Sequence, residues 1–219
     1  MEDAIRKQLQ ETGKFMMANG LAWGNAGNIS ARVSPDTCLI SASGTFLGEL
    51  GDDDLVLCSI PEARALSGTV KPSKELAMHA AVYQERPDIQ AVLHASPLHS
   101  TLLACASEEP PSNLFVETMY YLERIARVPY AHPGSRTLAE EVRKRAASTN
   151  VLLLENHGVL VYDTSLKEAR TALQTLEIAS QMAMAARSAG IRLRGLPEET
   201  VRSFLTESGY RPVRKWGTS

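Results

Sequence analysis

Two histidines in this chain end apolar segments, where metal or acid–base chemistry is easiest to build. His94 closes the apolar run 89–94, and His157 follows the run 151–154. Ligand sites collect at the ends of strands in α/β sheets. Neutral imidazole is a common ligand of divalent metals. We therefore expect His94 and His157 to share one metal ion, although a lone histidine is more often structural.

Glu75 is the carboxylate best placed to join these histidines. It stands in the first turn of a helix expected over residues 74–86, where the helix dipole favours the ionised carboxylate. A carboxylate beside two histidines could be a third metal ligand or a general base. The alternative is a carboxylate that only begins a helix.

Three small-residue turns lie in the first third of the chain. They are 24–28, Ser43-Gly44 and Ser73-Lys74. Turns and helix starts of this kind expose main-chain N–H groups that can bind phosphate. Each alone is typical of an ordinary turn or cap, but three together favour a phosphate site.

The elements that must position these residues follow from apolar spacing and from Gly, Pro and Ser. Four serines are expected to cap helices: Ser73, Ser96, Ser135 and Ser165. Pro97 would occupy the first helical position after Ser96. Helices are predicted over 3–18, 74–86, from 96, 117–125, 135–147, 166–188 and after Pro197, and strands over 29–33, 38–41, 55–60, 89–94, 127–130, 151–154 and 158–162. This mixture predicts one α/β domain over 1–219, with a core of about 4–188 and a helix and tail over 196–219.

Composition excludes several classes of protein. A net charge of -2 disfavours broad nucleic-acid binding. Cys38, Cys58 and Cys105 are few and widely spaced, so neither a disulfide framework nor a cysteine zinc site is indicated. The N-terminal segment lacks the apolar centre of a signal peptide, and no run is long enough to cross a membrane. We expect a cytoplasmic protein with no membrane partner.

Five sequence runs occur in a characteristic order. They are GNAGNISARV, SASG, KPSKELAMHAAVYQERPDIQAVLHASP, PYAHPGSRTLAEEV and LLLENHGVLV. The ordered set resembles the class II aldolase and adducin head family, which includes fuculose-phosphate aldolase and ribulose-phosphate 4-epimerase. The resemblance covers about residues 4 to 188.

The resemblance implies a three-layer α/β/α fold with a central, mostly antiparallel sheet. It implies a homotetramer with sites between subunits and a small phosphorylated sugar as substrate. A divalent metal, usually zinc, then acts as a Lewis acid and stabilises the enediolate that forms as a C–C bond breaks.

The resemblance also assigns roles to residues. Glu75 matches the acid/base glutamate, and the family often has Ser at the position of Lys74. A tyrosine from a neighbouring subunit often serves as the acid, and Tyr120 and Tyr121 lie in the corresponding region. The phosphate pocket would be formed by Asn28, Ser43, Gly44, Ser73 and Lys74.

The chain departs from the family pattern at Ser96. The family's metal site uses His-x-His and a third histidine, but this chain reads His94-Ala95-Ser96, with His157 matching the third. Three arrangements stay open. Glu75 could complete a two-histidine site, His99 could replace the missing ligand, or the metal could be weak or absent.

The function indicated first is a metal-dependent lyase that cleaves a phosphorylated ketose by retro-aldol chemistry. Epimerisation, dehydration and decarboxylation are alternatives, because the same enolate chemistry serves all of them. A non-catalytic module like the adducin head is the alternative from another class, motivated by Ser96.

Overall fold

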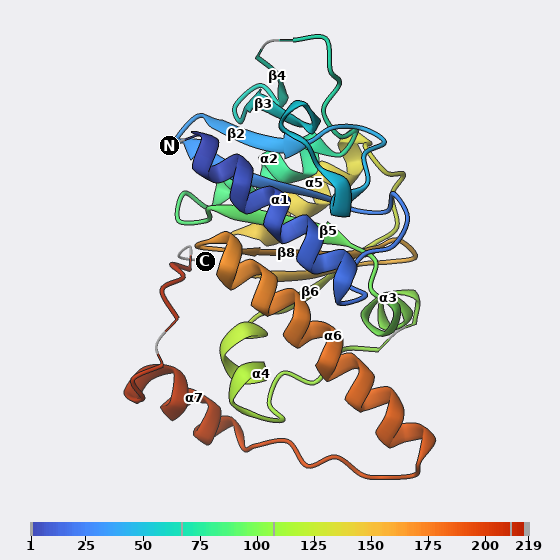
Figure 1. Ribbon diagram of the computed structural model, residues 1–219. Coiled ribbons are helices and arrows are strands. Elements are labelled where there is room, and N and C mark those ends of the chain that lie inside the picture. The colour runs from blue at the N-terminus through green and yellow to red at the C-terminus, as the bar shows by residue number, and fades with distance from the viewer. Residues whose placement is uncertain (1, 67, 107, 211, 217–219) are drawn as a thin grey trace.

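A computed structural model describes residues 2–66, 68–106, 108–210 and 212–216 (Figure 1). Its centre is an eight-stranded sheet in the order β4-β3-β2-β1-β5-β8-β7-β6. Neighbouring strands are antiparallel except for the parallel pair β6 and β7. The strands are β1 (Asn28–Ser34), β2 (Thr37–Ser41), β3 (Leu55–Ser59), β4 (Arg64–Ala65), β5 (Ala91–Ala95), β6 (Ile125–Val128), β7 (Val151–Leu154) and β8 (Gly158–Asp163).

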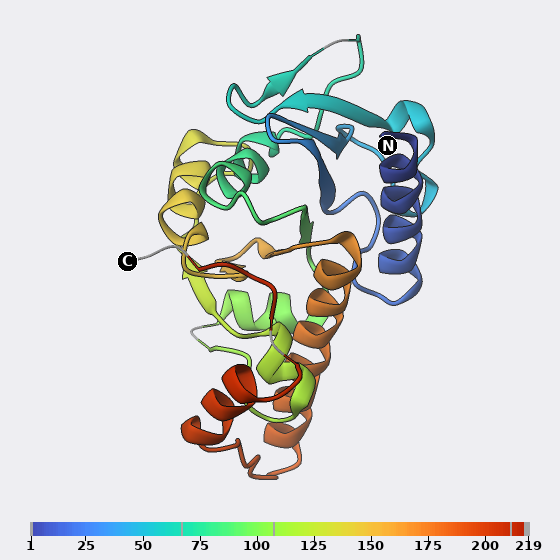
Figure 2. The ribbon, with the colours of Figure 1, turned by 90° about the vertical axis from the view of Figure 1, so that its left-hand side faces the viewer.

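Helices cover both faces of this sheet (Figure 2). On one face lie α1 and α6, with α3 and α4 packed beside α6; on the other lie α2 and α5. The three-layer α/β/α fold with a mostly antiparallel sheet is therefore confirmed. The helices are α1 (Glu2–Ala18), α2 (Leu76–Glu85), α3 (Leu98–Cys105), α4 (Val116–Tyr121), α5 (Arg136–Ala146), α6 (Leu166–Ser188) and α7 (Glu198–Glu207).

Alternation along the strands divides the core between the two faces. On β5, Leu93 packs in the cluster that contains the α1 and α6 side chains, whereas Val92 packs in the cluster formed with α2 and α5. Successive strand residues point to opposite faces, and every residue of β5 is buried. A strand covered on both faces explains the unbroken apolar run before His94.

Two of the expected caps are present. The Ser135 hydroxyl accepts the Leu138 N–H at the start of α5, and the Ser165 hydroxyl accepts the Glu168 N–H at the start of α6. Helix α6 has the predicted bounds, because its start and end signals are local in sequence.

The two other caps were predicted wrongly. Helix α2 begins at Leu76, so Glu75 immediately precedes the helix, and the Ser73 hydroxyl accepts the N–H of Glu75. In the part of the chain that the structure describes, no side chain caps helix α3, and the Ser96 hydroxyl donates to the carbonyl of His157. At Ser96 the reason is tertiary: the turn before β8 lies against the end of β5, and its His157 carbonyl accepts the serine hydroxyl.

Smaller differences concern element bounds. Helix α4 ends at Tyr121, and β6 lies two residues earlier than the predicted strand 127–130. The two-residue strand β4 was not predicted. Of the helices that the structure describes, none combines the length and the apolar composition needed to cross a bilayer.

Candidate metal centre and phosphate pocket

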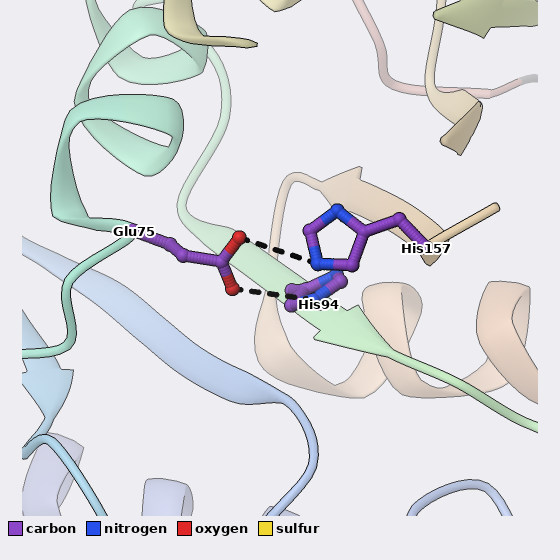
Figure 3. A group of neighbouring side chains, drawn as sticks. All are labelled: Glu75, His94 and His157. Carbon is purple, nitrogen blue, oxygen red and sulfur yellow. Dashed lines mark ion pairs between the residues drawn. The ribbon is translucent and has the colours of Figure 1, made fainter. Parts of the chain in front are cut away.

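Glu75, His94 and His157 converge from three elements (Figure 3). Glu75 precedes α2, His94 lies on β5, and His157 lies in the turn between β7 and β8. Glu75 Oε2 is 3.3 Å from His94 Nε2, and Glu75 Oε1 is 3.4 Å from His157 Nε2. The two rings meet edge to face, with centroids 4.7 Å apart. One ligand atom from each residue lies within 4.8 Å of the others.

The strand pairing and one glycine bring the two histidines together. In the β5–β8 ladder, Ala95 pairs with Val159, so the turn that carries His157 lies beside the end of β5. Gly158 has φ +156°, and a Cβ there would stand 2.5 Å from the carbonyl oxygen of Ala95. Only glycine permits this approach.

The tautomer of His94 follows from its partner. Its Nδ1 is 3.0 Å from the carbonyl oxygen of Val159, and a carbonyl can only accept a hydrogen bond. The Nδ1 atom therefore carries the proton, and in the neutral ring Nε2 presents a lone pair to the carboxylate of Glu75. Two acceptors facing each other need a cation or a proton between them.

The second histidine also leaves polar atoms of the cluster without partners. Burial, and then the neighbouring His94 ring, lower the pKa of His157, so its neutral form is favoured. Among the described residues, Glu75 Oε1 and His157 Nδ1 are buried atoms without a hydrogen-bond partner. Such atoms are uncommon in folded proteins and require an explanation.

This donor set fits a divalent metal. Two imidazole nitrogens and a carboxylate form a recurrent metal-binding set with open coordination positions. The Val159 carbonyl fixes the His94 ring as outer partners of metal-binding histidines do. Glu75, His94 and His157 would thus hold the metal that this donor set implies.

The expected phosphate residues border the same site. They line one cavity of about 520 Å³ together with the metal cluster: Asn28, Ser43, Gly44, Ser73, Lys74, Glu75, His94, Ser96 and His157. The main-chain N–H groups of Ser43 and Ser73 are already bonded within the fold, to the carbonyls of Lys71 and Ser41. Any phosphate binding by these two residues therefore falls to their hydroxyls, beside the Lys74 ammonium.

The side chain of Asn28 is turned toward the acid/base candidate. Its Nδ2 donates to Glu75 Oε2 at 2.9 Å, and its Oδ1 lies 2.6 Å from His79 Nε2. The sequence alone did not single out His79 as a site residue. The signal that could have singled it out is its position four residues after Glu75, which places both on one helix face.

Tyr120 and Tyr121 line a different cavity of this chain, together with Glu168 and Thr171. Their expected action from a neighbouring subunit therefore stays a prediction. His99 is bonded elsewhere: its Nδ1 lies 2.7 Å from Glu177 Oε1. The arrangement in which His99 replaces the missing ligand is thus not the one observed.

Comparison with known proteins agrees with this geometry. The family model described as Class II Aldolase and Adducin N-terminal domain matches residues 7–184. A 3-oxo-tetronate 4-phosphate decarboxylase from Haemophilus influenzae is 34% identical over 182 residues, which cover 81% of this chain and 86% of that protein. An L-fuculose phosphate aldolase from Methanocaldococcus jannaschii is 33% identical over 154 residues, covering 70% and 81%.

Solved structures show the same architecture. YgbL from Klebsiella pneumoniae, whose description leaves aldolase, epimerase and decarboxylase open, superposes with a TM-score of 0.84 at 29% identity and covers 93% of this chain and 98% of its own. The ordered motifs, the sheet and the family match agree. This chain belongs to the Class II Aldolase and Adducin N-terminal domain family.

Proposed function

We propose that this protein is a metal-dependent decarboxylase of a phosphorylated 3-oxo sugar acid, with 3-oxo-tetronate 4-phosphate as the first substrate to test. The observation that carries the proposal is the Glu75–His94–His157 cluster, which opens into a cavity with the phosphate candidates. The name of the Haemophilus influenzae relative supports the substrate.

The chemistry of such a substrate suits this site. A 3-oxo acid loses CO₂ when the C1–C2 bond breaks and its electron pair moves toward the C3 oxygen. A proton then adds at C2, and 3-oxo-tetronate 4-phosphate gives dihydroxyacetone phosphate and CO₂. The site must hold the phosphate, stabilise charge on the C3 oxygen and deliver one proton.

The residues divide these tasks. Ser43, Ser73 and Lys74 bind the phosphate at one end of the cavity. Glu75 takes up a proton from solvent and delivers it to C2. His94 and His157, with Glu75, hold a divalent metal, which we propose is zinc. When bound, the metal supplies Lewis-acid stabilisation of the oxygen that gains charge.

Retro-aldol cleavage of a phosphorylated ketose is the second candidate, supported by the name of the Methanocaldococcus jannaschii relative. There Glu75 would accept the proton of the hydroxyl group beside the breaking C–C bond. The two reactions differ in their products, since decarboxylation releases CO₂ and the aldol cleavage releases an aldehyde. A non-catalytic module is disfavoured because Glu75, His94 and His157 have no other evident task.

The first experiment measures metal content and turnover together. Wild type is expected to hold about one metal per chain and to release CO₂ from 3-oxo-tetronate 4-phosphate above the rate of a protein-free control. His157→Ala is expected to lose the metal. His99→Gln is the matched control, since His99 is bound to Glu177 outside the cluster, and it should retain the metal and the activity.

Two results would refute parts of this proposal. Absence of metal after incubation with zinc, manganese or cobalt would remove the metal-dependent mechanism. Turnover of L-fuculose 1-phosphate without CO₂ release from the oxo acid would favour the aldolase instead.

Three further features stay predictions from the sequence. We propose a homotetramer in which Tyr120 or Tyr121 reaches the site of a neighbouring subunit, and light scattering tests the assembly. Tyr120→Phe and Tyr121→Phe test the acid. The expected cytoplasmic location requires localisation in cells.

A further inference from the structure

A line of buried polar side chains runs from the metal cluster into the core. Asn28 Nδ2 donates to Glu75 Oε2 at 2.9 Å, and Asn28 Oδ1 lies 2.6 Å from His79 Nε2. His79 Nδ1 lies 2.7 Å from the Ser30 hydroxyl, which is 2.8 Å from the Tyr83 hydroxyl. His79 and Ser30 are fully buried, and Tyr83 is 1% exposed.

Two elements supply these residues at regular spacing. Asn28 and Ser30 alternate along β1 and therefore point to the same face of the sheet. Glu75 directly precedes α2, and His79 and Tyr83 follow it at intervals of four residues, along the helix face that meets this strand. The line is thus built by the packing of one helix on one strand.

The hydrogen bonds have a single direction. An ionised carboxylate only accepts, so the Asn28 amide turns its NH₂ to Glu75 and its oxygen to His79. His79 Nε2 must then carry the proton that it donates to Asn28. Burial lowers the pKa of His79 to about 3, so the ring is neutral and Nδ1 accepts from the Ser30 hydroxyl.

Tyr83 fixes the far end of the line. Burial raises the pKa of Tyr83 well above its ordinary value, so its hydroxyl stays protonated and donates to Ser30. Every donor then points toward Glu75. Reversal of the His79 tautomer would turn the Asn28 oxygen toward the carboxylate, where two acceptors would repel each other.

We propose that His79 is a positioning residue, which fixes the Asn28 amide and thereby aims the Glu75 carboxylate at His94 and His157. The effect of His79 on catalysis rests on the proposed function, whereas its effect on metal binding does not. Outer partners that orient metal ligands typically change metal affinity or activity by about 10- to 100-fold when they are mutated.

Two substitutions at this position separate positioning from packing. In His79→Gln, the side-chain NH₂ is as many bonds from Cα as Nε2 and can still donate to Asn28. In His79→Asn, the amide reaches only the position of Nδ1 and leaves Asn28 without its donor. Both variants place a neutral amide at the same buried site.

The first readout is metal affinity, measured for zinc by competition with a chromophoric chelator. We expect His79→Gln to bind within about threefold of wild type and His79→Asn to bind about 10- to 100-fold more weakly. The kcat for CO₂ release should follow the same order, and KM should change little because Ser43, Ser73 and Lys74 are untouched. Equal metal affinity of His79→Asn, His79→Gln and wild type would overturn the inference.

The second readout is the tautomer of His79, from ¹⁵N shifts of the ring in metal-free wild type. A proton on Nε2 is expected, and a proton on Nδ1 would overturn the inference. If His79→Asn fails to fold, Ser30→Ala replaces it, because loss of the Ser30 hydroxyl frees the tautomer. A Ser30→Ala protein with wild-type zinc affinity would also overturn the inference.

Failure of the proposed function looks different. A wild type that decarboxylates no oxo acid, yet binds zinc with an affinity that His79→Asn lowers and His79→Gln preserves, would refute the function and support this inference. If wild type decarboxylates the oxo acid and binds zinc, and both variants bind zinc as tightly as wild type, the function is supported and this inference is refuted.

Discussion

Acid should destabilise this protein through His79 in particular. The ring is completely buried between α2 and β1, with its two nitrogens bonded to Ser30 and Asn28. Burial, and then the neighbouring His94, lower its pKa from 6.5 to about 3. The folded protein therefore keeps this ring neutral at a pH where the unfolded chain takes up a proton.

The sign and size follow from proton linkage. Above the unfolded pKa neither state is protonated at this position, so its full contribution to stability is present. As the pH falls from 6.5 toward 3, only the unfolded state binds the proton, and stability is lost. At about pH 5 the pH is about one and a half units below the pKa of the unfolded ring, so the free energy of unfolding falls by about 2 kcal/mol.

Urea unfolding of metal-free protein at about pH 7 and pH 5 measures this loss. His79→Gln removes the titrating ring and keeps the donor to Asn28. Between these two pH values its free energy of unfolding should therefore fall by about 2 kcal/mol less than that of wild type. Both proteins are compared at one concentration, which cancels any contribution of assembly. An equal loss in the two proteins would refute the buried, neutral state of His79.

Three other predictions concern stability. Gly27→Ala should cost at least about 2 kcal/mol, because Gly27 has φ +92° and a Cβ would stand 2.6 Å from the carbonyl oxygen of His94; urea unfolding measures it. Arg214→Met should cost about 3 to 5 kcal/mol, because it leaves the Asp163 carboxylate, 2.7 Å away and 2% exposed, buried without its partner. Zinc at about 100 times its dissociation constant should stabilise wild type by about 3 kcal/mol, and His157→Ala should abolish this gain in a thermal melt.

Each of these predictions has a matched control. Gly24→Ala should cost less than Gly27→Ala, since Gly24 also has a positive φ but no atom of the described residues lies within 4 Å of an added Cβ. Arg187→Ala removes an exposed ion pair with Glu108 and should leave the unfolding midpoint unchanged. Zinc should not stabilise wild type in excess chelator. Equal effects of any variant and its control would contradict the corresponding prediction.

Much of the fold was predictable because its signals are local. The apolar run over β7 and the start and end of α6 were expected at their observed positions. Local signals failed at Ser73, where the helix begins two residues later than predicted, and at Ser96, whose hydroxyl bonds to a distant segment. The Ser96 hydroxyl donates to the carbonyl of His157, which lies in a turn 61 residues away in sequence.

The candidate site divides in the same way. The sequence by itself determined which residues could do chemistry: a carboxylate in the expected first turn of a helix, and a histidine at the end of each of two apolar runs. The tertiary structure decided that Glu75 lies within 3.4 Å of both rings, and that Asn28 and His79 stand behind it. These contacts depend on the order of the strands and on the packing of α2 against β1, and the periodicity of a segment reports how that segment is buried but not which partner buries it.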